Sequence, residues 1–371
     1  MGIRERLRLI IGYLFRWMGY PVEPGIVPIG TPGPSSPVLL TCNFNLTVHR
    51  VLKELQGIDC YLLIAPSKGI NVWCGACGDD FNTDSVVSIL KTSKIDGLVE
   101  HRTLILPQLS ATGIDPVAVK HRTGWTAKFG PVYAKDIHAY LEQGMTKTPE
   151  QSRVAFPLSA RLEMGHLYFI LLALLLSVIY GVLGLFLSAL DIWLYLHSIV
   201  ILAVIMYGSL TILPSFRGSS GRRKVMLFEV VVLVAIALID WGLLLNMFYW
   251  MWDSGLSFII GLVVAEDFHG LTPIYKSELG ERTWRKGKDR MKFLFGEYVL
   301  NPYGTIRIER EKCIGCRICL EVCPRGVYTF NDSDHKADLM FPDICVNCNA
   351  CVRRCPPHCL DIVDTSLPLP S

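Results

Sequence analysis

CIGCRICLEVCP (residues 313–324) and CVNCNACVRRCP (residues 345–356) decide the fold of the carboxy-terminal part of this chain. Both runs have the spacing Cys-x2-Cys-x2-Cys-x3-Cys-Pro. Thiolates are soft ligands for iron, and three of them at this spacing can hold one face of a cubane cluster. The doubled pattern with its trailing prolines predicts two [4Fe–4S] clusters and leaves structural zinc as the minor alternative.

The predicted ligands form two sets, because the fourth cysteine of each run ligates the other cluster in proteins with this pattern. The first cluster takes Cys313, Cys316, Cys319 and Cys355, and the second takes Cys345, Cys348, Cys351 and Cys323. Nine of the thirteen cysteines lie after residue 312, which excludes the disulfide framework of a small secreted domain. Cys359 is outside the pattern, and we expect it to pack as a small apolar residue. Residues 305–364 resemble a bacterial-type two-cluster ferredoxin with an α+β fold.

The composition indicates a membrane protein of two or three domains. The chain has 371 residues, of which 51% are hydrophobic, and its mean hydropathy is +0.37. The net charge of +3 is small, so nothing indicates a nucleic-acid partner.

Two long stretches lack Lys and Arg, and each is long enough for two membrane spans. We expect a transmembrane domain over residues 165–266 with about four crossings. Its helices should lie near residues 166–189, 191–213 and 225–249, with a shorter apolar piece near 254–265. This last piece is too short to cross the membrane alone. It crosses only if residues 246–252 extend it, and otherwise it is tilted or forms a re-entrant segment. The basic residues that follow, at 217–224 and 276–292, belong in the cytoplasm by the positive-inside rule. The soluble domains at both ends should therefore lie on the cytoplasmic side of the cell membrane, with residues 267–304 as a cytoplasmic connector.

Two acidic residues of the apolar region, Asp240 and Asp253, allow two interpretations. Carboxylates inside a membrane are costly and usually functional. At the outer interface, beside Trp250 and Trp252, they would need no such role. The sequence favours the interfacial interpretation and leaves the other open.

The amino-terminal segment has no small-residue cleavage site, so we expect no removable signal peptide. Residues 1–20 predict a basic, amphipathic helix, which either lies on an anionic membrane surface or packs on its own domain. Pro and Gly crowd residues 21–36, which we interpret as a linker.

Residues 37–160 alternate short apolar strands with helical patterns. Strands are expected at 37–42, 58–65 and 103–107, followed by two more within 117–132, and helices at 48–57, 83–93 and 134–144. This alternation predicts a doubly wound, Rossmann-like α/β domain with a mostly parallel sheet. Ligands of such sheets bind at the carboxyl ends of the strands.

The segment KGINVWCGACGDD (residues 68–80) follows the strand at 58–65 and so lies where this fold places ligands. Cys74 and Cys77 alone could form a redox CxxC or half of a zinc site. A second Cys or His pair at zinc spacing is absent from this part of the sequence.

Four stretches of this domain carry a resemblance to a known family: LLTCNFNLT, KGINVWC, HRTLILPQL and FGPVYAKD. They resemble the corrinoid domain of the mercury-methylation corrinoid protein and, more distantly, that of the large subunit of the corrinoid iron–sulfur protein of acetyl-CoA synthesis. The resemblance covers residues 36–160. The membrane segment fits the architecture of the first family, and the carboxy-terminal segment is similar to its ferredoxin partner, so the chain looks like the two partners fused.

The resemblance implies a cobalamin-like corrinoid that is capped on its lower face by a short helix containing Asn71, Val72, Trp73, Cys74 and Gly75. Cys74 is then the candidate axial ligand of cobalt. A thiolate ligand favours transfer of methyl as a carbanion equivalent, after which two low-potential electrons must restore the nucleophilic cobalt. The two [4Fe–4S] clusters are the implied source of these electrons.

The segment departs from the family after the cap. In the family, the cysteine is followed by two small residues, then by Gly, then by Lys. In this chain Cys77 stands in the place of that Gly, and Gly78 stands in the place of that Lys. Cys77 could give a second thiolate to a metal substrate, oxidise with Cys74, or only fill the space of a small residue. The tail after residue 364 lacks the family's extra cysteines, so the chain could be a paralogue with another methyl acceptor.

The leading hypothesis is a membrane-anchored, corrinoid-dependent methyltransferase, with Hg(II) as one candidate acceptor and a fused ferredoxin that reduces the cobalt. Its partners would be a methyl-donor protein or small molecule and an upstream electron donor. Two alternatives stay open: a membrane-bound electron-transfer protein, and a reductive activator of other corrinoid proteins that keeps no corrinoid itself.

Overall fold

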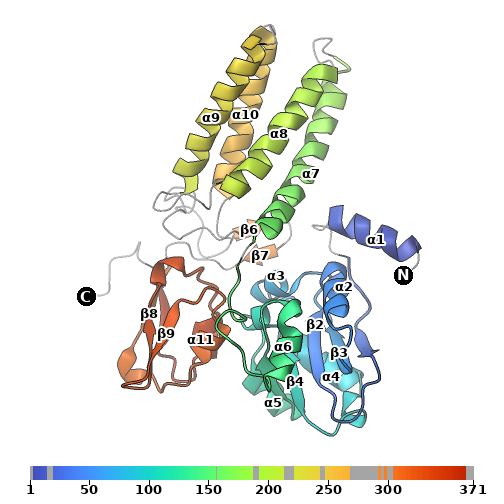
Figure 1. Ribbon diagram of the computed structural model, residues 1–371, viewed down its shortest axis with the longest axis vertical. Helices are drawn as coiled ribbons and strands as arrows, with labels where there is room; N and C mark the ends of the chain where they lie inside the picture. Colours follow the sequence, from blue (N-terminus) through green and yellow to red (C-terminus); the bar gives the residue numbers. More distant parts are fainter. Residues whose placement is uncertain are drawn as a thin grey trace. The chain divides into compact units, whose positions relative to one another are not determined.

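The computed structural model divides into two compact units, Met1–Val154 with Gly287–Ser371, and Ala155–Lys286 (Figure 1). The first unit contains an α/β domain and, after the second unit in sequence, a domain built around the two cysteine runs. We call the second of these the dicluster domain. The structure describes residues 3–14, 20–155, 157–186, 192–212, 221–242, 247–267, 291–293, 296–298 and 304–364.

The α/β domain is built on a five-stranded sheet in the order β1-β3-β2-β4-β5. Strands β2 to β5 are mutually parallel where they pair, and β1 joins β3 antiparallel at the edge. The strands are β1 (Gly25–Ile29), β2 (Val38–Cys42), β3 (Cys60–Ala65), β4 (Thr103–Leu106) and β5 (Thr126–Phe129). Every residue of β2 and β3 is buried, as expected for central parallel strands covered on both faces. The predicted Rossmann-like architecture is confirmed.

Alternate side chains of the strands pack into two separate apolar layers. Leu39, Leu62 and Ile105 face a layer that also contains Val48 of α2 and Tyr140 of α6. Their neighbours along the strands, with Leu40 and Leu63 among them, face the layer of α4 and α5. The helices are α2 (Asn45–Glu54), α3 (Val72–Cys77), α4 (Thr83–Thr92), α5 (Pro116–Thr123) and α6 (Ile137–Glu142), with short 3-10 turns η2 (Ile95–Gly97), η3 (Gln108–Ser110) and η4 (Ala134–Asp136).

Two sequence predictions for this domain are wrong. Residues 21–36 are not simply a linker, because β1 lies within them and places Val27 and Ile29 against the core. Pro28 is exposed on this edge strand, where a missing N–H is tolerated. The stretch from residue 116, predicted as a strand, is the helix α5: Asp115 caps it and Pro116 occupies its first turn.

The dicluster domain has the α+β fold that was predicted. Its terminal strands β8 (Gly304–Ile308) and β11 (Leu360–Asp364) pair antiparallel, and so do β9 (Tyr328–Asn331) and β10 (Lys336–Leu339). Each cysteine run passes through a 3-10 turn and then a short helix: η7 (Arg310–Lys312) and α11 (Ile318–Val322) in the first, η8 (Pro342–Ile344) and α12 (Ala350–Arg354) in the second. The two runs are therefore structural repeats of one another.

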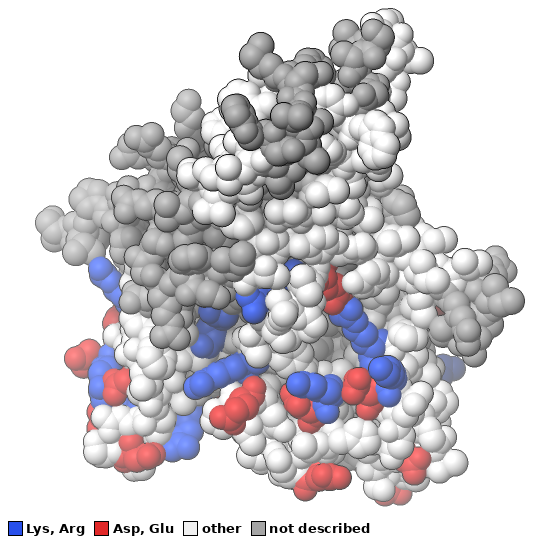
Figure 2. All heavy atoms as spheres, turned by 45° about the horizontal axis from the view of Figure 1, so that its top comes forward, with Lys and Arg blue, Asp and Glu red and all other residues white. Residues whose placement is uncertain are grey.

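The second unit consists of the helices α7 (Leu158–Leu183), α8 (Ile192–Ile212), α9 (Gly221–Gly242) and α10 (Met247–Asp267). Of the described helices, α7 is the one long and apolar enough to cross a membrane by its length and composition. The piece predicted near 254–265 is the carboxy-terminal part of α10, which begins at Met247. Figure 2 shows the described atoms of these helices as almost entirely uncharged, whereas Lys, Arg, Asp and Glu gather on the first unit.

Two polar pairs are buried within the helical unit. Asp253 of α10 is 1% exposed, and its Oδ2 lies 3.3 Å from Nδ1 of His197 on α8. Glu229 of α9, which the sequence analysis overlooked, accepts a hydrogen bond from the hydroxyl of Ser257 on α10. Asp253 is thus buried among the helices, and its predicted position at the membrane interface stays a prediction. The side chain of Asp240 lies outside the described residues.

The predicted amino-terminal helix is present as α1 (Ile3–Leu14), and its apolar residues Leu7, Ile10 and Ile11 are exposed. The predicted connector, residues 267–304, lies largely outside the described residues. Its described part includes a short hairpin of β6 (Met291–Phe293) and β7 (Gly296–Tyr298).

One buried side chain fixes the loop that leads from β3 into α3. Asn43, 5% exposed at the end of β2, accepts hydrogen bonds at Oδ1 from the backbone N–H and hydroxyl of Ser67 and from the backbone N–H of Gly69. Its amide nitrogen donates to the carbonyl oxygen of Val22. The carboxyl ends of two neighbouring strands are joined in this way just before α3 begins.

We expect Asn43→Ala to lower the opening free energy of β3 by about 2–4 kcal/mol, because it leaves several buried polar groups unpaired. Native-state hydrogen exchange of the β3 amides measures this value. The control is Asn82→Ala, which removes the side-chain cap of α4 and should cost only about 1 kcal/mol. Equal effects of the two variants would show that Asn43 does no more than an ordinary cap.

Candidate functional site

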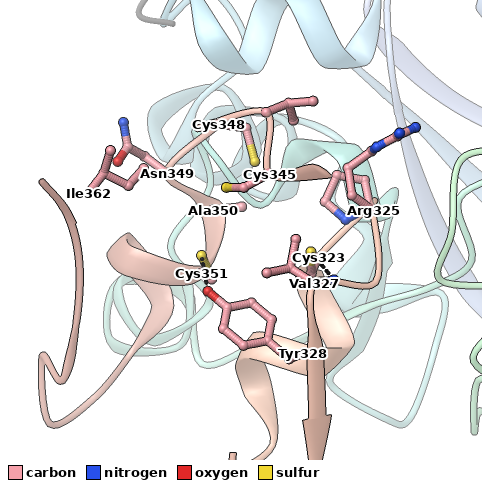
Figure 3. Close-up of a pocket in the computed structure, with 12 residues that line it drawn as sticks. Cys323, Arg325, Val327, Tyr328, Cys345, Cys348, Asn349, Ala350, Cys351 and Ile362 are labelled. Carbon is pink, nitrogen blue, oxygen red and sulfur yellow. Dashed lines mark hydrogen bonds between the residues drawn. The ribbon is translucent and has the colours of Figure 1, made fainter. Parts of the chain in front are cut away.

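Four cysteines predicted to share the second cluster surround one cavity of the dicluster domain. Figure 3 shows their sulfur atoms around this space, which is lined by Cys323, Cys345, Cys348 and Cys351. Cys323 comes from the first run and the other three cysteines come from the second. The fourth cysteine of the first run therefore lies with the first three of the second run, as predicted. The Tyr328 hydroxyl donates a hydrogen bond to Cys351 Sγ at 3.0 Å.

The arrangement of these thiols suits a cubane cluster better than a single ion. Among the described residues, no three His, Cys, Asp or Glu side chains lie close enough together to hold one metal ion. A [4Fe–4S] cluster binds each thiolate to a different iron and so needs a wider spacing. Backbone N–H groups approach the sulfur atoms, from Val327 to Cys323 at 3.5 Å and from Asn347 to Cys345 at 3.4 Å. Such donors stabilise the negative charge of a ligated cluster.

Two of the predicted first-cluster ligands, Cys313 and Cys355, lie near a fifth cysteine. Cys359 Sγ lies 3.3 Å from Cys355 Sγ, and Cys359 also hydrogen-bonds with Cys313. Cys359 is buried, as predicted, but it is not merely a packing residue, because its sulfur contacts two ligands from opposite ends of the domain. Cys316 is exposed, so this cluster has one edge that faces solvent.

The cap helix α3 follows β3 at the carboxyl edge of the sheet. Asn71 is its N-cap, and the Asn71 side chain accepts a hydrogen bond from the Cys74 backbone N–H at 2.9 Å. Gly75 and Ala76 face the core, whereas Val72, Trp73 and Cys74 remain partly exposed. The helix therefore leaves Val72, Trp73 and the thiols of Cys74 and Cys77 partly exposed near the strand ends.

Cys77 lies one turn further along the same helix and has a different environment. Its sulfur is 3.9 Å from the Thr112 hydroxyl, next to η3, which follows β4. Burial raises the pKa of the Cys77 thiol to about 11, although the hydrogen bond from Thr112 opposes this shift. The sulfur of Cys77 therefore lies against the loop after η3, and both the space-filling and the ligand interpretations stay open.

The lysine that the family motif has directly after the cap helix is missing here, but Lys68 lies shortly before the helix. Lys68 Nζ lies 2.6 Å from Asp80 Oδ1, and this ion pair joins the two ends of the 68–80 segment. The Lys68 side chain is 80% exposed, so the pair is largely screened by solvent.

Contacts join the α/β domain and the dicluster domain, both of which belong to the first compact unit. Arg353 Nη1 donates to the Thr112 carbonyl oxygen at 2.5 Å, and Arg354 Nη1 lies 2.9 Å from Asp115 Oδ1. Sequence analysis missed these residues. The one feature of the sequence that could have indicated them is the pair of adjacent arginines in CVRRCP. Such a pair has many other uses, so it does not by itself predict a contact between domains.

Comparison with known proteins agrees with this division of the chain. Residues 19–141 match the family described as CO dehydrogenase/acetyl-CoA synthase delta subunit. Residues 312–362 match the 4Fe-4S dicluster domain family. The α/β domain is thus similar to a domain of the CO dehydrogenase/acetyl-CoA synthase family, and the carboxy-terminal segment is similar to 4Fe-4S dicluster domains.

Curated relatives resemble the α/β domain. The acetyl-CoA decarbonylase/synthase complex subunit gamma of Methanopyrus kandleri is 35% identical over 132 residues, which are 35% of this chain and 28% of the relative. The same subunit of Archaeoglobus fulgidus is 36% identical over 124 residues, 33% of this chain and 26% of the relative. The corrinoid/iron–sulfur protein large subunit of Moorella thermoacetica is 29% identical over 126 residues, 33% of this chain and 28% of the relative. The matched part of this chain spans roughly a quarter of each relative.

We expect Tyr328→Phe to lower the reduction potential of one of the two clusters by about 20–60 mV, because it removes a hydrogen bond worth about 0.5–1.5 kcal/mol to a cluster ligand. An anaerobic redox titration followed by EPR measures both potentials. Tyr61→Phe, which removes a hydroxyl contact within the α/β domain, is the control and should change neither. An unchanged pair of potentials in Tyr328→Phe would contradict this role.

Gly315 lies in the CIGC loop with φ +71°, and a Cβ there would overlap the carbonyl oxygen of His335. Gly315→Ala should therefore prevent assembly of the first cluster and reduce the iron content from about eight to about four atoms per chain. Iron analysis of anaerobically purified protein checks this. Gly124→Ala has the same positive-φ strain with open space around the Cβ, and it should keep all the iron.

Proposed function

We propose that this chain is a membrane-anchored, corrinoid-dependent methyltransferase whose dicluster domain reduces the corrinoid cobalt. The observation that carries the proposal is the position of Cys74. It is an accessible thiol on a partly exposed apolar helix at the carboxyl edge of a sheet whose sequence matches corrinoid/iron–sulfur proteins. A dicluster domain is present in the same chain and contacts the loop beside that helix.

The residues of the cap have separate roles in this proposal. Cys74 would be the axial ligand of cobalt, while Val72 and Trp73 would cover the lower face of the corrin ring. Asn71 positions the helix by capping it, and Gly75 allows the helix to approach Phe81, which lies 3.0 Å from a Cβ built at residue 75. The bound corrinoid would supply the chemistry of methyl transfer, for which a thiolate ligand favours departure of methyl toward a soft cation.

The two clusters would supply the low-potential electrons that return the cobalt to its nucleophilic state after methyl transfer. Each [4Fe–4S] cluster carries one electron at a time, so two clusters match the two-electron need. An upstream electron donor would deliver electrons at the exposed edge near Cys316. A methyl-donor protein or small molecule would reload the corrinoid.

A position at the cytoplasmic face of the cell membrane is part of the proposal. The helical unit exposes many large apolar side chains, which would be unfavourable in water. Examples are Leu175, Val178, Val182, Val231 and Val234, each more than half exposed. The exposed apolar residues of α1 would lie on the membrane surface. The positive residues at 217–224 support the cytoplasmic side, as does the need for a reducing compartment.

Hg(II) is one candidate acceptor, because the cap segment resembles that of the mercury-methylation proteins. The missing lysine after the cap helix favours another soft acceptor. A second candidate function is electron transfer to a separate corrinoid protein, and the dicluster domain alone would support it equally well.

The test is metal analysis of the full chain, purified anaerobically in mild detergent and reconstituted with cobalamin. We expect about one cobalt and about eight iron atoms per chain, and a visible band that shifts in Cys74→Ala. Cys77→Ala is the matched control and should leave the band unchanged, because the Cys77 sulfur lies 3.9 Å from the Thr112 hydroxyl beside η3. Full iron without cobalt in the wild type would overturn methyl transfer and leave the electron-transfer function.

A further inference from the structure

The contacts between the α/β domain and the dicluster domain lie mostly beside predicted ligands of the second cluster. Arg353 and Arg354, which bind the segment after β4, lie in α12 after Cys351, and Arg354 also directly precedes Cys355 of the first set. Lys147 Nζ donates to the Glu321 carbonyl oxygen at 3.0 Å, and the Val154 N–H donates to that of Pro324 at 2.8 Å. Glu321 and Pro324 flank Cys323, the second cluster's ligand from the first run.

One side chain of each ionic contact is buried, whereas its acidic partner is partly exposed. The Lys147 side chain is 5% exposed, and that of Arg354 is 11% exposed. Lys147 also donates to Oε1 of Gln108 on η3, at 2.9 Å. The buried apolar side chains of the two domains belong to one contiguous cluster, which includes Phe81 and Ala111 on one side and Cys351 on the other.

The cap helix takes part in the same region. Cys77 hydrogen-bonds with Thr112, whose carbonyl oxygen receives the Arg353 hydrogen bond. Arg353 belongs to α12, which also carries Cys351 of the second ligand set. The second cluster is thus the one next to the cap, and Cys316 of the first cluster faces solvent.

We propose that α12 docks the dicluster domain in cis on residues 108–115, with Arg354 and Asp115 as positioning residues, so that the second cluster is the direct electron donor to the group under the cap helix. This inference rests on the proposed function for the identity of that group. Electrons enter at the first cluster and pass to the second. In each transfer the second cluster is oxidised by one electron and the cobalt is reduced by one, with no bond made to the protein. Two transfers complete the reduction, and the upstream low-potential donor replaces both electrons.

The docking is tested with the full chain and single charge removals. Asp115→Asn keeps an N-cap oxygen for α5 but loses the charge, and Arg354→Gln loses the partner charge. Each should raise amide exchange in residues 108–115 at least about tenfold and slow cobalt reduction by a similar factor, and the double variant should be no worse than either single one. Arg354→Lys should recover part of the loss. Iron content and cluster potentials should stay unchanged, which separates positioning from a folding defect.

The matched control is the exposed ion pair of Arg122 and Asp84, 2.6 Å apart within the α/β domain. Arg122→Gln should change neither exchange in 108–115 nor cobalt reduction. Effects of Arg354→Gln no larger than those of the control would overturn the docking. In protein that takes up no cobalt, the exchange comparison still decides the docking, so a failure of the proposed function is told apart from a failure of this inference.

The identity of the donor cluster is tested by EPR of the reduced, cobalt(II)-loaded chain. Cys316→Ser changes a ligand of the first cluster only and so marks its signal. We expect magnetic coupling to cobalt(II) on the unaltered signal of the second cluster. Coupling confined to the altered signal would overturn the assignment.

Discussion

The exchange of cysteines between the two runs is the constraint on which the carboxy-terminal half of this protein depends. Cys323 of the first run lies among the cysteines of the second, and Cys355 of the second lies beside Cys359 and near Cys313. Neither repeat can complete its ligand set alone, so the two must fold against each other. Helix α12 carries Cys351 and directly precedes Cys355, and its arginines consequently have a fixed position relative to both clusters.

A second constraint acts at the carboxyl edge of the α/β sheet. Parallel strands end together there, and Asn43 holds the loop after β3 against the end of β2. The cap helix starts from this fixed loop, and Asn71 sets its first turn. Cys74 and Cys77 are both partly exposed and lie one helix turn apart, with the Cys77 sulfur beside Thr112 after η3.

The two constraints act within one compact unit, which contains both the α/β domain and the dicluster domain. In the gamma subunit of Methanopyrus kandleri and the large subunit of Moorella thermoacetica, the matched domain is only about a quarter of the whole chain. Here a dicluster domain is fused in the same chain and touches the loop beside the cap. A covalent fusion raises the effective concentration of the electron donor, so a small docking surface with a few buried ionic contacts is sufficient.

The sequence by itself determined the two cluster ligand sets, the parallel α/β sheet and the cap segment, because ligand spacing, strand periodicity and a resemblance are local signals. It did not predict β1, whose Pro- and Gly-rich sequence hides a strand that is stable only beside β3, or α5, whose Asp-Pro cap was overlooked. The second ligand contact of Cys359, the burial of Glu229 and the pairing of Arg354 with Asp115 were decided by the tertiary structure alone. Each of these contacts joins side chains that are far apart in the sequence, and a local sequence pattern cannot predict which of them come together.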